Sequence, residues 1–181
     1  DLINKTDTTA FTYYFTFEDS PFPSVCSFDI GPVHFVNLDS NPVDKNALTS
    51  NNDIINPAKS TWLENDLTQA NTRLDLKWII TFMHLNPYSI VPNSKQISAY
   101  ASKMQTGKVD LSLCGHNHDY CRTKSILDPG PTLDPANGVT YVMSQATGFK
   151  LSGKTKPITP TPAWYAYQET PTDPSYIVWT V

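Results

Sequence analysis

The sequence contains few glycines, few cysteines and no long apolar run. Among 181 residues there are seven glycines and three cysteines. Three cysteines are too few for the disulfide framework of a small secreted domain, and no run approaches the roughly 18 apolar residues that a membrane-spanning helix needs. Positive charge is also scarce, with 13 Lys and Arg against 17 Asp and Glu and a formal net charge of −4. This balance disfavours nucleic-acid scaffolds as partners, because they require a positive field.

The cysteines leave one question open. Cys114 and Cys121 flank a pair of histidines, so they could form one disulfide bridge or remain as two buried thiols. Free cysteine usually packs as a small hydrophobe, and this favours the thiols.

The pattern of apolar residues predicts an α/β fold with mixed sheets and outer helices. Gly31-Pro32 is a turn signal inside a β-hairpin, and Trp62, Leu63 and Leu67 have helical spacing. We see no linker, so residues 1–181 are expected to form part of one domain. The expected elements are a strand at 11–18, a hairpin at 24–39, a loop at 40–58, a helix within 56–74, a buried strand at 77–84, a helix at 94–106, a buried strand at 109–116, and strands at 120–127, 138–146, 163–169 and 175–181. Trp164, Tyr176 and Trp179 are expected in the core.

Three of the four histidines follow the two strands that we expect to be buried. His84 ends KWIITFMH, and His116 and His118 follow VDLSLCG. Catalytic groups collect beyond the carboxyl ends of strands in α/β sheets. In an extended stretch His116 and His118 would point to the same side, and Gly115 would let the backbone bend tightly before them. Converging imidazoles can bind one or two metal ions, so metal binding is favoured for these three, whereas His34 is interpreted as a hydrogen-bonded structural residue.

Four short blocks carry a more specific signal. GHNHDYCR (115–122) matches G-H-x-H-x-Y-x-R, and FMHLNPYS (82–89) is similar to an H-R-P-P-Y-S element. CSFDIGPVHFVNLDS (26–40) is similar to S-F-D-x-G-x-V-H-F-x-x-L-D-T, and STWLENDL (60–67) to Q-x-x-W-L-x-x-D-L. In this order, the blocks resemble those of the purple acid phosphatases, within the calcineurin-like metallophosphoesterases.

The resemblance implies the C-terminal part of a four-layer αββα metallophosphoesterase sandwich. It also implies a dinuclear metal centre that hydrolyses phosphate esters. His84 and His116 would bind one metal ion and His118 the other. The expected ions are iron paired with zinc, manganese or a second iron.

Other polar residues near these histidines have less certain roles. Asn86 and Tyr88 follow His84 closely and would line the substrate pocket, although Tyr88 is explained equally well as a packing aromatic. Asp39, at the end of a hairpin arm, is expected to make a loop-end hydrogen bond. The residues expected to orient the histidine ligands or stabilise their loop are Asp119, Tyr120 and Arg122.

Half of the family's motif set is missing from this chain. An aspartate, a G-D-x-x-Y element and a G-N-H-E element would precede the hairpin and supply the Asp, Tyr and Asn ligands. None of the seven glycines precedes Asp or Asn, and the sequence does not begin with Met. We therefore expect residues 1–181 to be the C-terminal part of a longer protein and to be inactive in isolation. Half of this fold would expose an apolar sheet face, so we expect it to bind the missing N-terminal portion or to self-associate.

Two alternatives remain at this stage. Asn93 stands where the family often has a histidine, which slightly favours a binding or structural protein on a degenerate phosphoesterase fold. Alternatively, the three histidines could bind one zinc ion with water in the fourth position, although ligands arranged for two metals fit poorly around one. The resemblance weakly favours a secreted or periplasmic location.

Overall fold

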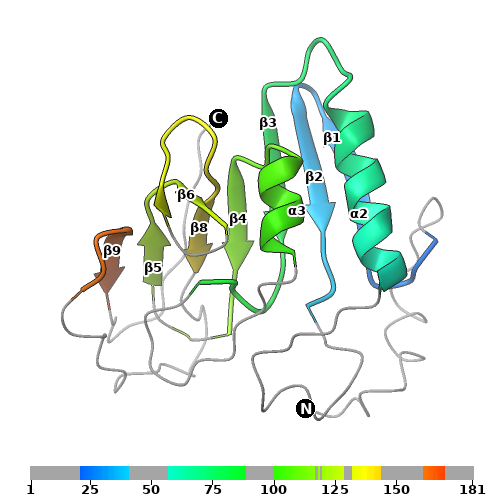
Figure 1. Ribbon diagram of the computed structural model, residues 1–181. Helices are drawn as coiled ribbons and strands as arrows, with labels where there is room; N and C mark the ends of the chain where they lie inside the picture. Colours follow the sequence, from blue (N-terminus) through cyan, green and yellow to red (C-terminus); the bar gives the residue numbers. More distant parts are fainter. Residues whose placement is uncertain are drawn as a thin grey trace, which may run out of the picture.

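In the computed structural model, two helices lie against one face of a mixed β-sheet (Figure 1). The structure describes residues 21–40, 57–88, 100–116, 118, 120–128, 132–143 and 161–169. Its elements are β1 (Cys26–Ile30), β2 (Val33–Asn37), α2 (Pro57–Ala70), β3 (Trp78–Phe82), α3 (Ala101–Thr106), β4 (Leu111–Cys114), β5 (Tyr120–Thr123), β6 (Ile126–Leu127), β7 (Thr132–Leu133), β8 (Thr140–Met143) and β9 (Tyr165–Glu169). The α/β class expected from the sequence is confirmed.

The sheet combines a parallel centre with antiparallel edges. Within the described part of the chain its seven strands lie in the order β1-β2-β3-β4-β8-β5-β9. Strands β2, β3, β4 and β8 are parallel to one another, whereas β1, β5 and β9 pair antiparallel with their neighbours. The predicted hairpin is confirmed as β1 and β2, and it turns at Gly31, whose φ of 55° suits glycine.

One face of the sheet carries the main core. Helix α2 buries Leu63, Leu67 and Ala70, which lie on one stripe of a helix because they are four and three residues apart. Leu67 and Met104 of α3 belong to the same cluster as Val36 of β2. Both helices lie in front of the sheet in Figure 1. The described residues therefore form one helix layer on one sheet layer.

The opposite face of the sheet carries an aromatic stack. The rings of Phe28 and Phe35 have centroids 5.2 Å apart, and those of Phe35 and Phe82 lie 5.8 Å apart. Phe28 remains 48% exposed, and Ile30 and Trp78, whose register places them on the same face, are also exposed. Successive side chains of a strand point to opposite faces of the sheet. The aromatic side chains therefore alternate with the side chains that contact the helices.

Several predicted elements have different bounds in the structure. The strands expected at 77–84 and 109–116 end at Phe82 and Cys114, so their histidines lie in the following loops. The strand expected at 120–127 is divided, because β5 joins the large sheet while β6 pairs with β7, a strand that the sequence did not indicate. Trp164 packs against the core as expected. Outside the described residues lie the predicted strands 11–18 and 175–181, most of the loop 40–58, the first part of the helix 94–106, and Tyr176 and Trp179.

No helix in the described part of the chain is both long and apolar enough to cross a membrane.

The three cysteines are buried free thiols. Cys114 of β4 and Cys121 of β5 are both paired with Met143, from opposite sides of β8. Two strand spacings separate them by about 9–10 Å, which is more than the roughly 7 Å that a disulfide can span. The thiols favoured by the sequence are confirmed, and the bridge is excluded.

Candidate metal centre

His84 and His116 meet at the carboxyl edge of the parallel strands. Strands β3 and β4 are adjacent and parallel, with Phe82 opposite Leu113, so both end at this edge of the sheet. Nδ1 of His116 lies 3.2 Å from Nε2 of His84. The two rings have centroids 5.1 Å apart and stand nearly perpendicular, at 83°. The strand ends therefore bring together two imidazoles that are 32 residues apart in the sequence.

Backbone hydrogen bonds hold these two histidines in place beyond the strands. The N–H of Met83 donates to the carbonyl of Leu113 (3.0 Å), and the N–H of Gly115 donates to the carbonyl of His84 (2.9 Å). A Cβ on Gly115 would lie 3.3 Å from Nδ1 of His84. We expected Gly115 to permit a tight bend. Its φ is not left-handed, and the absence of a Cβ leaves room for the close approach of the His84 ring.

The backbone of the histidine loop is not extended, so that expectation is wrong. His116 and His118 have φ values of 77° and 46°, in the left-handed region. The cause is the strand order: β8 lies between β4 and β5, so the loop must cross the end of β8 and reverse direction. Such backbone costs on the order of 1–3 kcal/mol in non-glycine residues and is concentrated at functional sites.

The spacing of the two ring nitrogens suits a shared metal ion. Nitrogens that are each about 2.0–2.1 Å from one ion, at angles near 90–110°, lie about 2.9–3.4 Å from each other. The observed 3.2 Å between His84 and His116 falls in this range. Without a metal, the same contact is a hydrogen bond in which one ring nitrogen donates and the other accepts.

His84 is disposed to be uncharged. Its pKa lies below the usual imidazole range, first because neighbouring atoms displace water from the ring and second because of the charge of His118. Metal ions bind the neutral form of histidine, so both effects favour a ligand role.

No group of three His, Cys, Asp or Glu in the described residues could hold a metal ion. The single zinc site made by His84, His116 and His118 is therefore not found.

Asn86 and Tyr88 lie beside the pair and are largely engaged within the protein. Oδ1 of Asn86 accepts a hydrogen bond from the N–H of Tyr88 (2.9 Å), and its amide nitrogen is buried without a hydrogen-bond partner. The hydroxyl of Tyr88 donates to Asp128 (2.6 Å), and its ring packs on Tyr141 and Trp164. Burial and the Asp128 carboxylate raise the pKa of Tyr88 above its ordinary value. These contacts describe a packing aromatic.

The remaining candidates lie along β5 and the loop before it. Tyr120 starts β5, and its ring centroid is 5.7 Å from that of Tyr167 on β9. Arg122 is exposed and lies opposite Val142 of β8. Asp119 lies outside the described residues. Their role in orienting the histidines stays a prediction.

Sequence reasoning missed Ser40, which anchors the segment after His84. The buried hydroxyl of Ser40 accepts a hydrogen bond from the N–H of Leu85 (3.0 Å). Ser40 follows β2, the strand next to β3, so its position beyond a parallel strand was the available signal.

Asp39 makes the loop-end contacts that its position predicted. Its carboxylate accepts a hydrogen bond from the hydroxyl of Ser24 (2.7 Å) and forms an ion pair with Lys59 of α2. These contacts hold the end of β2 against the start of α2.

Comparisons with known proteins agree with the fold. No protein-family model matches the chain. It is similar in structure to the purple acid phosphatase PPD1 from yellow lupin (Lupinus luteus) seeds, with a TM-score of 0.63, 17% identity and 86% of the chain covered. It is also similar to GAP50, the anchor in the inner membrane complex of Plasmodium, with a TM-score of 0.54, 15% identity and 82% covered. PhoD gives a TM-score of 0.46 at 11% identity.

These structures show which fold the chain has and how much of each neighbour's length it spans. The expected similarity to a metallophosphoesterase fold is confirmed at the level of structure. The chain spans 28% of the length of the lupin phosphatase structure and 43% of the GAP50 structure.

Proposed function

We propose, from the metallophosphoesterase fold, that this chain is the C-terminal part of the catalytic domain of a metal-dependent phosphoesterase. In this proposal His84 and His116 bind one ion of a dinuclear centre and His118 binds the other. An upstream segment supplies the Asp, Tyr and Asn ligands, and the substrate is a phosphate ester. The isolated chain is then inactive.

The observation that carries the proposal is the 3.2 Å contact between the ring nitrogens of His84 and His116. Two imidazoles held by the backbone at the ends of adjacent parallel strands, with a lowered pKa on His84, form half of a metal site. The left-handed backbone at His116 and His118 is strained for non-glycine residues, and such strain is concentrated at functional sites.

The protein's own residues hold and orient the ligands. The carbonyl of His84 is fixed by Gly115, and the segment after it is fixed by Ser40, so the ring of His84 has little freedom to move. When bound, two metal ions (iron with zinc, manganese or iron) would polarise the phosphate oxygens and lower the pKa of a bound water. Metal binding requires neutral imidazoles, and His84 already favours that state.

The aromatic face supports the need for a further segment. Phe28, Phe35 and Phe82 form a stack on the face away from the helices, and Ile30 and Trp78 are exposed on it. We propose that the segment carrying the missing ligands covers this face, since that segment would complete both the site and the apolar layer. Analytical ultracentrifugation of the chain alone should show self-association, with a complex of one-to-one stoichiometry once the upstream segment is added. A chain that stays a compact monomer and does not bind the upstream segment would contradict the proposal.

Metal analysis of the complete protein tests the dinuclear centre. We expect about two ions per molecule. His118→Ala should retain one ion, because His84 and His116 remain, and it should lose hydrolysis of an aryl phosphate ester. His34→Gln, a matched histidine change remote from the site, should retain both ions and activity. Two ions bound to the His118→Ala variant would refute the assignment.

A second candidate function is a binding or structural protein on the same fold. The structural similarity to GAP50, described as an anchor, favours it. In that case the complete protein would bind no metal ion and would cleave no aryl phosphate ester, while His116→Ala would leave its partner binding unchanged.

A further inference from the structure

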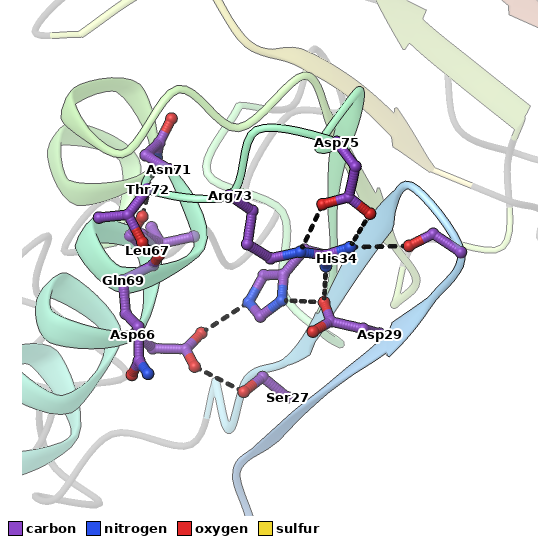
Figure 2. Close-up of polar contacts among 11 residues, drawn as sticks. Ser27, Asp29, His34, Asp66, Leu67, Gln69, Asn71, Thr72, Arg73 and Asp75 are labelled. Carbon is purple, nitrogen blue, oxygen red and sulfur yellow. Dashed lines mark hydrogen bonds and ion pairs between the residues drawn. The ribbon is translucent and has the colours of Figure 1, made fainter.

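His34 sits at the other end of the sheet, between two carboxylates (Figure 2). Its Nδ1 lies 2.8 Å from Oδ1 of Asp29 on β1, and its Nε2 lies 3.0 Å from Oδ2 of Asp66 on α2. The residue is only 6% exposed. It pairs with Ile79 in the sheet, and β3 runs about 10 Å further to its end at Phe82, before the loop that holds His84. His34 therefore joins the edge hairpin to the helix far from the candidate metal centre.

The geometry of these contacts fixes the protonation state of His34. An ionised carboxylate can only accept hydrogen bonds, and a neutral imidazole has only one N–H to donate. Both contacts are therefore satisfied only when both ring nitrogens carry protons, that is, by the imidazolium.

Neighbouring groups also contact the two carboxylates. The guanidinium of Arg73 forms an ion pair with Asp29 (2.6 Å), and the hydroxyl of Ser27 donates to Asp66 (2.5 Å). Arg73 is in turn held by Asp75 and by the carbonyl of Gly31 at the hairpin turn (Figure 2).

The charged and titratable groups around the ring come from each neighbouring segment. Strand β1 provides Asp29 and the thiol of Cys26, which interacts with Asp66. Helix α2 provides Asp66, the loop after it provides Arg73, and the neighbour on β3 is the apolar Ile79. Burial lowers the pKa of His34, but the hydrogen bonds and charges of Asp66 and Asp29 outweigh it and raise the pKa above 6.5.

We propose that His34 is a charged cross-link that clamps the β1–β2 hairpin to α2 and that the clamp loosens when the imidazolium loses its proton. Deprotonation leaves a lone pair facing a carboxylate on one side of the ring. Strand β1 then keeps its ladder to β2, the stack of Phe28 on Phe35, the hydrogen bond of Ser27 to Asp66 and the ion pair of Asp29 with Arg73, but it loses the bridge through the His34 ring. The clamp is a pH-sensitive element of the fold, and it does not depend on the proposed catalytic activity.

The direction of the pH effect follows from linkage. A group whose pKa is higher in the folded state stabilises the fold fully below its unfolded value, here 6.5. This contribution is lost as the pH rises towards the folded value. The unfolding equilibrium constant should therefore rise by up to about tenfold per pH unit in that window, because one proton is released on unfolding.

An NMR titration of the imidazole nitrogens in the full chain tests the clamp directly. The signals of His34, assigned by their loss in His34→Gln, should show both nitrogens protonated at neutral pH and titrate above 6.5. Asp66→Asn should lower that titration midpoint. Glu64→Gln, which removes a carboxylate on the same helix that pairs with Lys103, should leave it unchanged. Titration of His34 at or below 6.5, or an equal effect of both variants, would overturn the proposal.

Amide hydrogen exchange shows which strand loosens when His34 loses its proton. Amides of β1 should lose protection relative to those of β4 as the pH passes the midpoint of His34. In the His34→Gln variant the ratio of the two protection factors should not change with pH. Loss of protection that is uniform across both strands in the wild-type chain would also overturn the proposal.

Discussion

The two ends of this sheet place histidines in opposite electrostatic settings. At one end, His34 is buried between Asp29 and Asp66, and its pKa is raised. At the other, His84 lies against His116, and its pKa is lowered by burial and by the charge of His118. His34 therefore favours the protonated imidazole, whereas His84 favours the neutral one. Only the neutral imidazole can bind a metal ion. The surroundings of each histidine therefore indicate whether it suits a structural role or a ligand role.

The largest expected effect is on the metal-binding end. His116→Ala removes one of the two imidazoles that meet at 3.2 Å. Loss of a metal ligand should reduce kcat/KM of the complete protein for an aryl phosphate by about a thousandfold or more. His116 is only partly buried and lies in a loop, so the denaturation midpoint should hardly change. Retained activity would remove the distinction between the two ends.

The next effect concerns stability at the other end. His34→Ala leaves Asp66, whose side chain is 15% exposed, without its cationic partner. The free energy of unfolding should fall by about 2–3 kcal/mol at pH below 6.5. Urea denaturation measures it, and kcat/KM of the folded fraction should stay as in the wild type. A variant as stable as the wild type would show that the clamp contributes nothing.

A smaller effect is expected from Gly115→Ala. The new Cβ would lie 3.3 Å from Nδ1 of His84, so the ring must shift by a few tenths of an ångström. Catalysis is sensitive to such displacements, and kcat/KM should fall by about tenfold. The φ of Gly115 is not in the left-handed region, so thermal unfolding should be little affected. Unchanged kinetics would mean that the position of His84 is not critical.

The smallest effect is expected from Asp75→Asn. Asp75 forms an ion pair with Arg73, and its side chain is 68% exposed. Exposed ion pairs contribute little, so neither the denaturation midpoint nor the titration of His34 should move measurably. A clear shift in the His34 titration would extend the clamp outward to this residue.

The local patterns in the sequence predicted the elements that depend on local information. Gly31-Pro32 marked the hairpin turn, and the spacing of Leu63 and Leu67 marked α2. The meeting of His84 and His116 also followed from local patterns, because two buried strands each ended near a histidine.

The features that the sequence did not predict depend on long-range pairing. The left-handed backbone at His116 and His118 arises because β8, some twenty residues later, is inserted between β4 and β5. Asp66 reaches His34 across 32 residues, and Tyr88 reaches Asp128 across 40. No periodicity records such contacts, so the sequence could place a structural histidine at 34 without naming either carboxylate.

Met143 separates Cys114 from Cys121 in the sheet, and this arrangement keeps the two sulfurs from forming a bond with each other. An oxidant cannot join the two sulfurs without removing β8 from between them. Burial also raises the pKa of Cys114 to about 12, so almost no thiolate is present to begin an exchange reaction. In the folded chain these two thiols are therefore kept from oxidation to a disulfide.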